Sequence, residues 1–245
     1  MANEWFYDWF NSPYYHLLYH KRNYVEAEYF INNLCARISP HPNSRMLDIA
    51  CGRGRFALYL NKHGHSVTGI DLSVENIHYA KRFENDSLHF FVQDMRQLSY
   101  SNEFDIAFNL FTSFGYFRTD EEHINTLINF KNALKPSGLL VLDYFNSHKV
   151  IQNRVVEEIK TINGIDFHIQ KTISNDQIIK TITFTDKNKS YIFHEMVRLF
   201  TIDDFKRFFT QSGFEIMTNF GSYGLDDFDI EHSDHLIFIC KRSDA

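Results

Sequence analysis

The sequence predicts an α/β protein with a doubly wound, mostly parallel sheet of seven strands and an inserted antiparallel β segment. Between residues 44 and 145, short apolar runs alternate with helical patterns, which is typical of successive βαβ units. These runs are apolar throughout, as expected where helices cover both faces of a sheet. After residue 146 the pattern changes to β-branched alternation, which favours antiparallel strands.

The first part of the chain supplies the alternating elements. Residues 23–38 place apolar side chains at helical spacing, and the stretch SPHPNS then interrupts the chain. Apolar runs predict five strands, at residues 44–50, 66–70, 88–92, 104–110 and 138–145. The intervening patterns predict helices at residues 53–63, 73–83 and 119–134. Ser73 is the expected N-cap of the second of these helices, and the residues 135–138 end the third.

The second part of the chain predicts the insertion and the end of the sheet. Residues 154–200 indicate an antiparallel meander of about four strands, with hairpin turns at Asn163-Gly164 and at residues 186–188. Thr201 to Ser212 indicates a helix that stops at Gly213, and residues 214–220 and 235–241 indicate two closing strands. We therefore divide the chain into three parts: an N-terminal helical cover at 1–43, an α/β domain at 44–145 and 201–245, and an inserted β segment at 146–200.

Composition and charge exclude several classes of protein. The 245 residues carry a net charge of −6, with 44% hydrophobic and 23% charged residues, as in ordinary globular proteins. Mild acidity argues against a duplex nucleic-acid partner, which requires a basic face. No apolar run approaches the roughly 18 residues of a membrane helix, and no signal-peptide pattern is visible, so we expect a cytoplasmic protein without a membrane partner. The 16% aromatic content fits a rich core, an aromatic-lined pocket, or both.

The sequence carries no cysteine motif or HExxH motif for a metal. The three cysteines share no CxxC spacing, and none of the thirteen histidines belongs to an HExxH motif. His232 and His235 lie three residues apart beside acidic residues, where a solvated polar loop is the favoured interpretation over a metal site. We therefore expect no metal.

Residues 46–55, MLDIACGRGR, carry the most informative motif. Small residues at positions 50, 52 and 54 fall where a strand turns into a helix, which lets the backbone approach a ligand closely. The second strand ends in Asp71, whose carboxylate is suited to accept both hydroxyls of a ribose. The third ends before Asp94, which suits an exocyclic amine such as that of adenine.

Two cofactors compete for this pattern. Residues 52–57 satisfy GxGxxA, which makes a nicotinamide dinucleotide and an oxidoreductase one possibility. Asp48 argues against it, because a carboxylate there would oppose a pyrophosphate but suits a cofactor that carries an ammonium group. Asp94 and the antiparallel tail argue against it as well, since a dinucleotide fold would continue into a second mononucleotide-binding half.

The motifs MLDIACGRGR, VTGIDLS, FFVQDM and LKPSGLLVLDYF together resemble those of class I S-adenosylmethionine-dependent methyltransferases, in the same order. The similarity is greatest to bacterial small-molecule methyltransferases with an inserted β segment. The resemblance implies a Rossmann-like methyltransferase fold, S-adenosyl-L-methionine as cofactor, and methyl transfer to N or O of a small-molecule acceptor. The chain departs from the family at Ala50, where glycine is more usual, and lacks the proline often found before the last strand.

The resemblance also implies site residues. Those expected to bind the cofactor are Tyr14, Arg22, Asp48, Ala50, Cys51, Gly52, Gly54, Arg55, Asp71, Leu72, Asp94, Met95, Asn109 and Leu110. Those expected to border the acceptor are Tyr15, Phe114, Tyr116 and Tyr144. No catalytic residue is assigned, and the candidates for a base are His16, Tyr116, Asp143, His194 and Glu195. For Glu195 and Arg198, charge pairing across an exposed sheet is the favoured interpretation.

Two further expectations concern the walls of the site. The aromatic segment 1–22 should cover the cofactor, with Tyr14 facing its methionine portion and Arg22 pairing with its carboxylate. Residues 146–200 should lie at the carboxyl edge of the main sheet and help to wall the acceptor pocket. A non-catalytic S-adenosylmethionine-binding module is the main alternative function. The identity of the acceptor and the choice between monomer and homodimer stay open.

Overall fold

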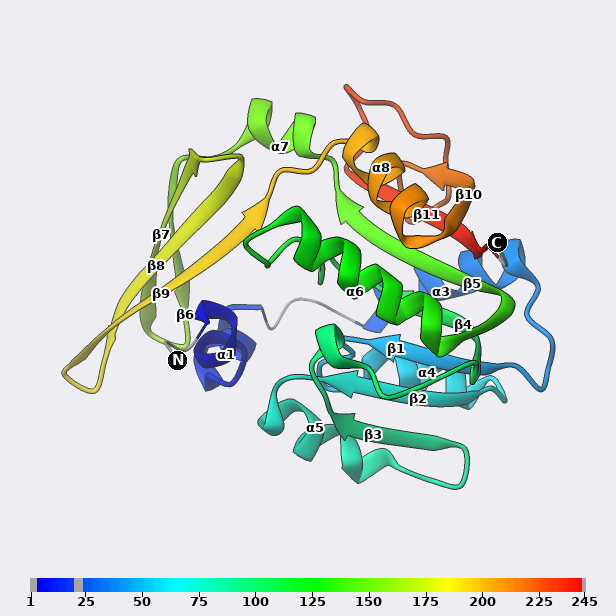
Figure 1. Ribbon diagram of the computed structural model, residues 1–245. Helices are drawn as coiled ribbons and strands as arrows, with labels where there is room; N and C mark the ends of the chain where they lie inside the picture. The colour runs from blue at the N-terminus through cyan, green and yellow to red at the C-terminus, as the bar shows by residue number, and fades with distance from the viewer. Residues whose placement is uncertain (1–3, 20–23, 244–245) are drawn as a thin grey trace.

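A seven-stranded sheet in the order β10-β11-β5-β4-β1-β2-β3 forms the centre of the molecule (Figure 1). The computed structural model describes residues 4–19 and 24–243. The strands are β1 Arg45–Ile49, β2 Ser66–Asp71, β3 Leu88–Val92, β4 Phe104–Asn109, β5 Leu134–Phe145, β10 Phe214–Phe220 and β11 His235–Arg242. Strands β1 to β5 pair in parallel, and β11 pairs antiparallel with both β5 and β10. The structure therefore confirms the predicted mostly parallel sheet.

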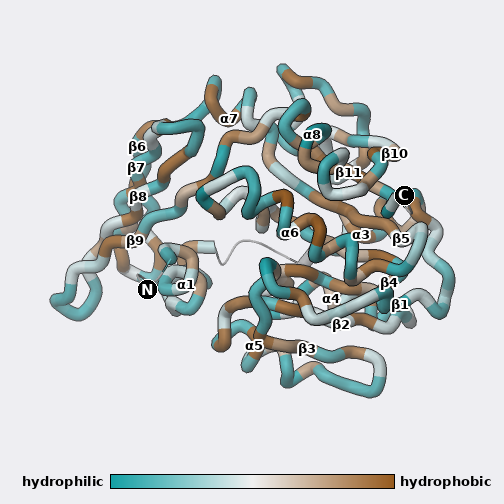
Figure 2. Tube along the Cα trace, viewed as in Figure 1, coloured by the Kyte–Doolittle hydropathy of each residue, from teal (hydrophilic) through white to brown (hydrophobic). Residues whose placement is uncertain are grey.

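Helices cover both faces of this sheet. One face is covered by α3 Tyr24–Ile38, α4 Arg55–Lys62 and α5 Val74–Ala80, and the other by α6 Asp120–Ala133 and α8 Ile202–Ser212. Two short 3-10 helices, η1 Lys81–Phe83 and η2 Met95–Gln97, complete the crossovers. Apolar residues concentrate along the central strands in Figure 2, as burial between two helical layers requires. In the described part of the chain, every helix is too short or too polar to span a bilayer.

Local sequence sets the ends of several helices. Thr119 and Thr201 each form a capping box with an acidic side chain three residues later, at α6 and α8. Gly213 ends α8 in the left-handed conformation, at φ +77°. The helix predicted over 119–134 is confirmed as α6, but the next strand, predicted to begin at Gly138, already begins at Leu134, so residues 135–138 belong to β5.

Residues 157–198 form a separate four-stranded antiparallel sheet, here called the insert. Its strands are β6 Glu157–Ile162, β7 Ile165–Ser174, β8 Gln177–Asp186 and β9 Lys189–Arg198. The turns at Asn163-Gly164 and Lys187-Asn188 have positive φ, as tight hairpins favour. Before the insert lies a helix that was not predicted, α7 Ser147–Asn153, whose N-cap Asn146 accepts a hydrogen bond from the His148 N–H.

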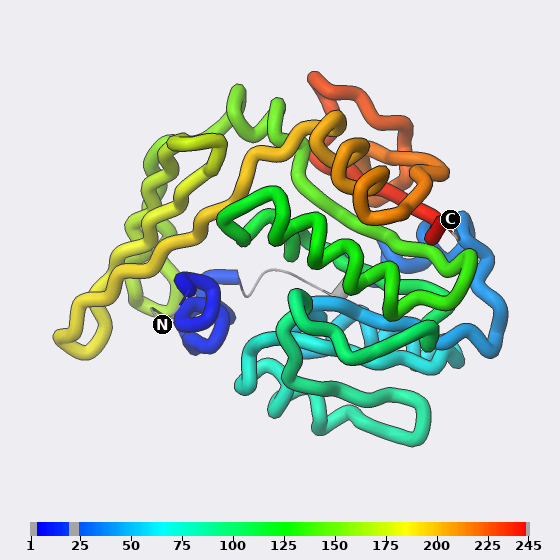
Figure 3. Tube along the Cα trace, in the orientation of Figure 1, coloured from blue at the N-terminus to red at the C-terminus, as the bar shows by residue number. Residues whose placement is uncertain are grey.

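Helices α1 Trp5–Phe10 and α2 Pro13–Leu18, here called the cover, pack mainly on the insert. Trp9 and Leu18 share a buried cluster with Phe167, Ile182 and Phe184 of the insert. Figure 3 shows the N-terminal segment beside the strands of the insert, although more than 130 residues separate them in the chain. The cover and the insert thus have a hydrophobic core of their own.

Candidate active site

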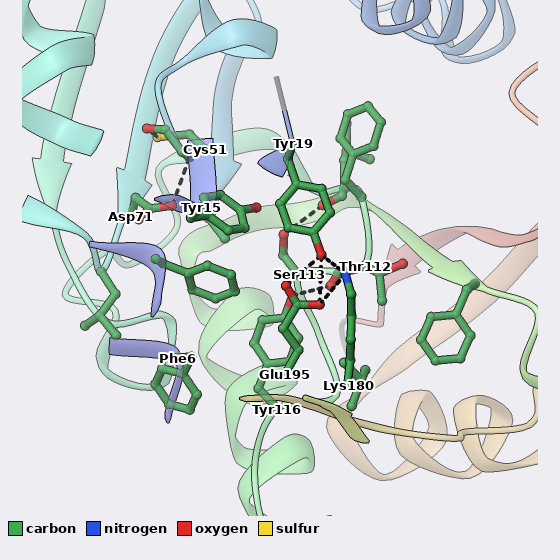
Figure 4. A pocket seen from close by; sticks show the side chains of 18 of the residues that line it. Phe6, Tyr15, Tyr19, Cys51, Asp71, Thr112, Ser113, Tyr116, Lys180 and Glu195 are labelled. Atoms are coloured by element: carbon green, nitrogen blue, oxygen red, sulfur yellow. Dashed lines mark hydrogen bonds and ion pairs between the residues drawn. The ribbon is translucent and has the colours of Figure 1, made fainter. Parts of the chain in front are cut away.

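A cavity of about 800 Å³ lies at the carboxyl edge of the main sheet, where the cover and the insert face it. Its floor is formed by the residues that follow β1, β2, β3 and β4, and its walls by α1, α2, α7 and strands β7 to β9. Figure 4 shows side chains from all three parts of the chain pointing into this space. Ligands of doubly wound sheets bind at this edge.

The turn between β1 and α4 follows a strained path. Ala50, Gly52 and Gly54 have φ values of +61°, +57° and +79°. Alanine in this conformation costs roughly 1–2 kcal/mol, so the methyl group at position 50 is tolerated but not neutral. Ala50, Cys51 and Gly52 line the cavity, and the backbone there can approach a ligand closely.

Gly54 was predicted to contact the cofactor, but in the structure a glycine is required at this position because of packing. A Cβ at this position would lie 2.6 Å from the ring of Phe90, and Gly54 is not among the residues that line the cavity. The glycine therefore allows α4 to pack closely against β3.

Asp71 connects this turn to the end of β2. One carboxylate oxygen accepts a hydrogen bond from the Gly52 N–H and the other from the Ser73 N–H, both at 2.8 Å (Figure 4). Burial raises the pKa of Asp71, and the two backbone donors act in the opposite direction. Asp71 and Leu72 both line the cavity, and Asp71 as a whole residue is half-buried there. Asp71 therefore fixes the turn and still presents oxygen atoms to the cavity.

Asp48 lies deeper, inside β1, with a relative exposure of 2%. Burial raises its pKa to about 7, and the nearby Asp71 adds to the shift. No hydrogen-bond partner of its Oδ2 is found in the described chain. A buried polar atom of this kind on a cavity wall is suited to a ligand that carries a donor or a positive charge.

Asp94, after β3, is engaged by an arginine rather than left open. Arg96 donates to Asp94 at 2.6 Å and, through two further bonds of 2.9 and 2.7 Å, to Glu4 in front of α1. These three charged side chains join the cover to the sheet edge. Asp94 and Met95 line the cavity, so one carboxylate faces both Arg96 and the cavity.

The segment after β4 is also strained. Phe111 and Thr112 have φ values of +57° and +54°, and the Phe111 N–H donates to Asp143 at 2.9 Å. Leu110 and Arg55 line the cavity, whereas Asn109 is buried behind it and donates to the Ile49 carbonyl at 3.2 Å. The predicted cofactor contact of Asn109 is therefore indirect at most.

Four predicted contacts are not at the cavity or cannot be assessed. The Tyr14 hydroxyl donates to Asp186 at 2.8 Å and its ring packs on the insert, so the prediction for Tyr14 is wrong. Phe114 is fully buried in the core on the α6 and α8 face, and Tyr144 is fully buried with its hydroxyl bonded to the Arg198 carbonyl. Both are core residues rather than acceptor contacts. Arg22 lies outside the described residues.

The candidate bases separate clearly. Asp143 is buried and accepts hydrogen bonds from the Phe111 N–H and the Tyr223 hydroxyl, which indicates a structural role. His194 is exposed and is not on the cavity wall. His16, Tyr116 and Glu195 do line the cavity, as does Tyr15. Burial lowers the pKa of His16 to about 4, so its imidazole is neutral at neutral pH.

Glu195 is the centre of a polar cluster that sequence reasoning did not find. Its carboxylate accepts from the Trp9 indole at 2.7 Å and from the Tyr19 hydroxyl at 2.7 Å, and it pairs with Lys180 at 3.3 Å. The predicted charge pairing across the sheet is therefore present, but with Lys180 and in a buried setting. The register that pairs Lys180 with Glu195 depends on a two-residue turn at Lys187-Asn188, whereas the predicted turn at 186–188 would have placed Ile179 opposite Glu195.

The chain is similar to known proteins in both fold and sequence. A solved S-adenosylmethionine-dependent methyltransferase from Clostridium acetobutylicum ATCC 824 shares the fold over 94% of this chain and 96% of its own, with a TM-score of 0.79 and 18% identity. Residues 46–138 match the family described as a methyltransferase domain. The chain therefore resembles a methyltransferase domain over these residues and shares the fold of a solved S-adenosylmethionine-dependent methyltransferase.

Two curated relatives have more specific names. The glycine/sarcosine N-methyltransferase of Aphanothece halophytica is 33% identical over 135 residues, which are 52% of this chain and 49% of the relative. A dTDP-3-amino-3,4,6-trideoxy-α-D-glucopyranose N,N-dimethyltransferase of Streptomyces venezuelae is 29% identical over 123 residues, 50% of this chain and 51% of the relative. The chain thus matches about half the length of each.

The residues at the cavity fit S-adenosylmethionine. The unpartnered Asp48 oxygen suits a cationic cofactor, and the glycine at position 52 has no atom within 4 Å of where a Cβ would lie, which leaves room beside the turn. The oxygens of Asp71 face the cavity at the end of β2, where a ribose is bound in related sheets.

Proposed function

We propose that the protein transfers a methyl group from S-adenosylmethionine to a nitrogen or oxygen atom of a small-molecule acceptor. The observation that carries this proposal is the cavity itself, in which Asp48 and Asp71 lie at one end and a polar cluster with aromatic rings lies at the other. A volume of about 800 Å³ is in the upper part of the usual range for ligand pockets, which suits two ligands bound together. The names of the two curated relatives point to small acceptors as well.

Each end of the cavity has a separate role in this proposal. Asp71 would bind the ribose hydroxyls, with Leu72, Asp94 and Met95 near the adenine. Asp48 would lie near the cationic part of the cofactor. The turn residues Ala50, Cys51 and Gly52 would lie along it, and Arg55 and Leu110 would border its methionine portion.

Bound S-adenosylmethionine supplies a methyl group on a sulfonium, so the leaving group is already activated. The chain therefore contributes mainly alignment, for which effective-molarity gains reach about 7–11 kcal/mol. The cover closes the cavity with Trp5, Phe6 and Phe10, which exclude water from the reacting atoms. We also expect the protein to act in the cytoplasm, without nucleic acid, as a monomer or homodimer.

Two alternative functions remain to be tested against this proposal. A module that binds S-adenosylmethionine without catalysis would need no acceptor space, whereas the cavity extends well beyond the sheet edge to the insert. A nicotinamide-dependent oxidoreductase is disfavoured by Asp48, which is buried where a pyrophosphate would approach.

Calorimetry tests the cofactor, and label transfer tests the reaction. We expect binding of S-adenosylmethionine and S-adenosylhomocysteine, no binding of NADH or NADPH, and methyl label recovered in a small molecule after incubation with a metabolite extract. Asp71→Asn should weaken cofactor binding at least about tenfold, because hydrogen bonds to a charged group contribute roughly 1.5–3 kcal/mol each. Asp86→Asn, at an exposed position away from the cavity, is the matched control. Equal affinity in the wild type and Asp71→Asn would contradict the ribose role.

A further inference from the structure

The polar cluster at the far end of the cavity is built from the cover and the insert. Tyr19, at the end of α2, donates to both oxygens of Glu195, at 2.7 and 2.9 Å, and accepts a hydrogen bond from Lys180. Trp9 donates to the same carboxylate at 2.7 Å. The side chains of Glu195 and Lys180 retain relative exposures of only 17% and 15%. The carboxylate is therefore fixed in position and largely shielded from water.

Aromatic rings line the cavity beside this cluster. Trp5 lies 5.2 Å from Tyr116 between ring centroids, Phe10 lies 5.0 Å from Tyr15, and Tyr15 lies 5.0 Å from Tyr19. All five rings line the cavity. Aromatic faces attract cations, and a carboxylate beside them adds a charged hydrogen-bond acceptor.

We propose that Glu195 binds the amino group of the methyl acceptor, so that the substrates are primary or secondary amines with an apolar or aromatic body. This inference rests on the proposed function and narrows it from nitrogen or oxygen to nitrogen. A carboxylate held by three donors among aromatic rings recognises a cation better than a neutral hydroxyl, because a cation that takes the place of the Lys180 ammonium keeps this half-buried anion neutralised, whereas a hydroxyl does not.

Lys180 supports this assignment because it shows that the carboxylate already pairs with an ammonium group. Its nitrogen lies 3.3 Å from Glu195 and it is the one cationic group that contacts this carboxylate in the described chain. Burial lowers the pKa of Lys180. When a second ammonium enters the cavity, Lys180 can therefore release its proton or move aside at a reduced cost. The other cavity lysine on the insert, Lys171, pairs instead with Glu158 at 3.5 Å.

The same carboxylate has a role in the proton balance. The acceptor enters as an ammonium, whose nitrogen has no lone pair until Glu195 accepts one proton and passes it to solvent. The neutral amine would then form the N–C bond as the C–S bond of the sulfonium breaks and leaves its electron pair on sulfur, so that the products are a neutral thioether and a methylated ammonium. Glu195 stabilises the positive charge that develops on this nitrogen. No further reactant is required.

Matched amine and alcohol probes test the assignment. Calorimetry on the complex with S-adenosylhomocysteine should show benzylamine binding at least about tenfold more tightly than benzyl alcohol, as expected for a hydrogen bond to a charged group. In Glu195→Gln this preference should fall below about threefold, with the affinity for S-adenosylhomocysteine unchanged. Glu157→Gln, at an exposed position of the insert, is the control and should keep the preference. Equal binding of the two probes, or no binding of benzylamine, would overturn the proposal.

Lys180→Met gives a second readout that a structural role would not produce. Removal of the ammonium leaves the Glu195 charge buried without a counter-ion, so the melting temperature should fall. Benzylamine should then raise the melting temperature of Lys180→Met more than that of the wild type, because the probe replaces the lost cation. Equal shifts would contradict the proposal.

The two proposals fail separately in these experiments. If S-adenosylhomocysteine does not bind the wild type, the proposed function is wrong. If it binds and the amine preference is absent, only the assignment of Glu195 is wrong.

Discussion

Asp48→Asn should change how the stability of the protein depends on pH. Burial raises the pKa of Asp48 from 3.8 to about 7 in the folded chain. Between these values the folded state holds a proton that the unfolded state has released. The free energy of unfolding must therefore fall as pH rises from about 4 to about 7.

The size of the effect follows from the two pKa values. The difference between 3.8 and about 7 corresponds to about 4 kcal/mol when Asp48 is fully ionised. Asparagine cannot ionise, so Asp48→Asn does not lose this part of its stability as the pH rises. The difference in the free energy of unfolding, variant minus wild type, should therefore increase by about 1.4 kcal/mol per pH unit between pH 5 and pH 7. Any constant cost of the buried amide cancels in this slope.

Urea denaturation of cofactor-free protein at several pH values between 5 and 8 measures this difference. Asp86→Asn, at an exposed site, should show a pH-independent difference from the wild type. If Asp48→Asn and the wild type show parallel pH dependences, Asp48 is ionised in the folded chain and its assignment as a buried, protonated carboxyl is refuted.

Two further substitutions test the cover and the turn after β1. Arg96→Met removes both hydrogen bonds to Glu4, so amide hydrogen exchange in α1 and α2 should become faster when it is measured by mass spectrometry. An unchanged exchange rate would show that packing alone holds the cover in place. Gly54→Ala should lower the free energy of unfolding by about 2–5 kcal/mol, because it combines left-handed strain with a 2.6 Å approach to the ring of Phe90. Gly52→Ala, where nothing lies within 4 Å, should lose only about 1–2 kcal/mol in the same denaturation assay, and equal losses would contradict the steric argument.

Much of the α/β body was predictable because its signals are local. A strand, a glycine-rich turn and a helix follow one another within a few residues. The carboxyl ends of the parallel strands β1 and β2 therefore lie at the same edge of the sheet, independently of the other segments of the chain. The positions of Asp48 and Asp71 at the cavity follow from that rule. The start of β5 was misplaced because Pro136 and Gly138 are typical of a helix stop but lie within the strand.

The acceptor side was less predictable because it depends on contacts between distant segments. Tyr14 and Tyr15 are neighbours in an aromatic sequence, yet one packs on the insert and the other lines the cavity. Successive side chains of β9 point to opposite faces of the insert, so Glu195 and His194 lie on different faces. The sequence does not say which of these faces is turned toward the main sheet. That choice is made by the apolar residues that α1 and α2 bury against the insert.

The shared core of the cover and the insert has a consequence for the order of folding. The Trp9 bond to Glu195 joins residues 186 positions apart, and α1 and α2 have only six residues each, too short to be stable helices alone. On the ribosome, α1 and α2 are synthesised before β9 and must therefore wait for it before they acquire their partners. Strands β1 to β5 can begin to pair earlier, and the cavity gains its outer wall only when the cover joins the later insert.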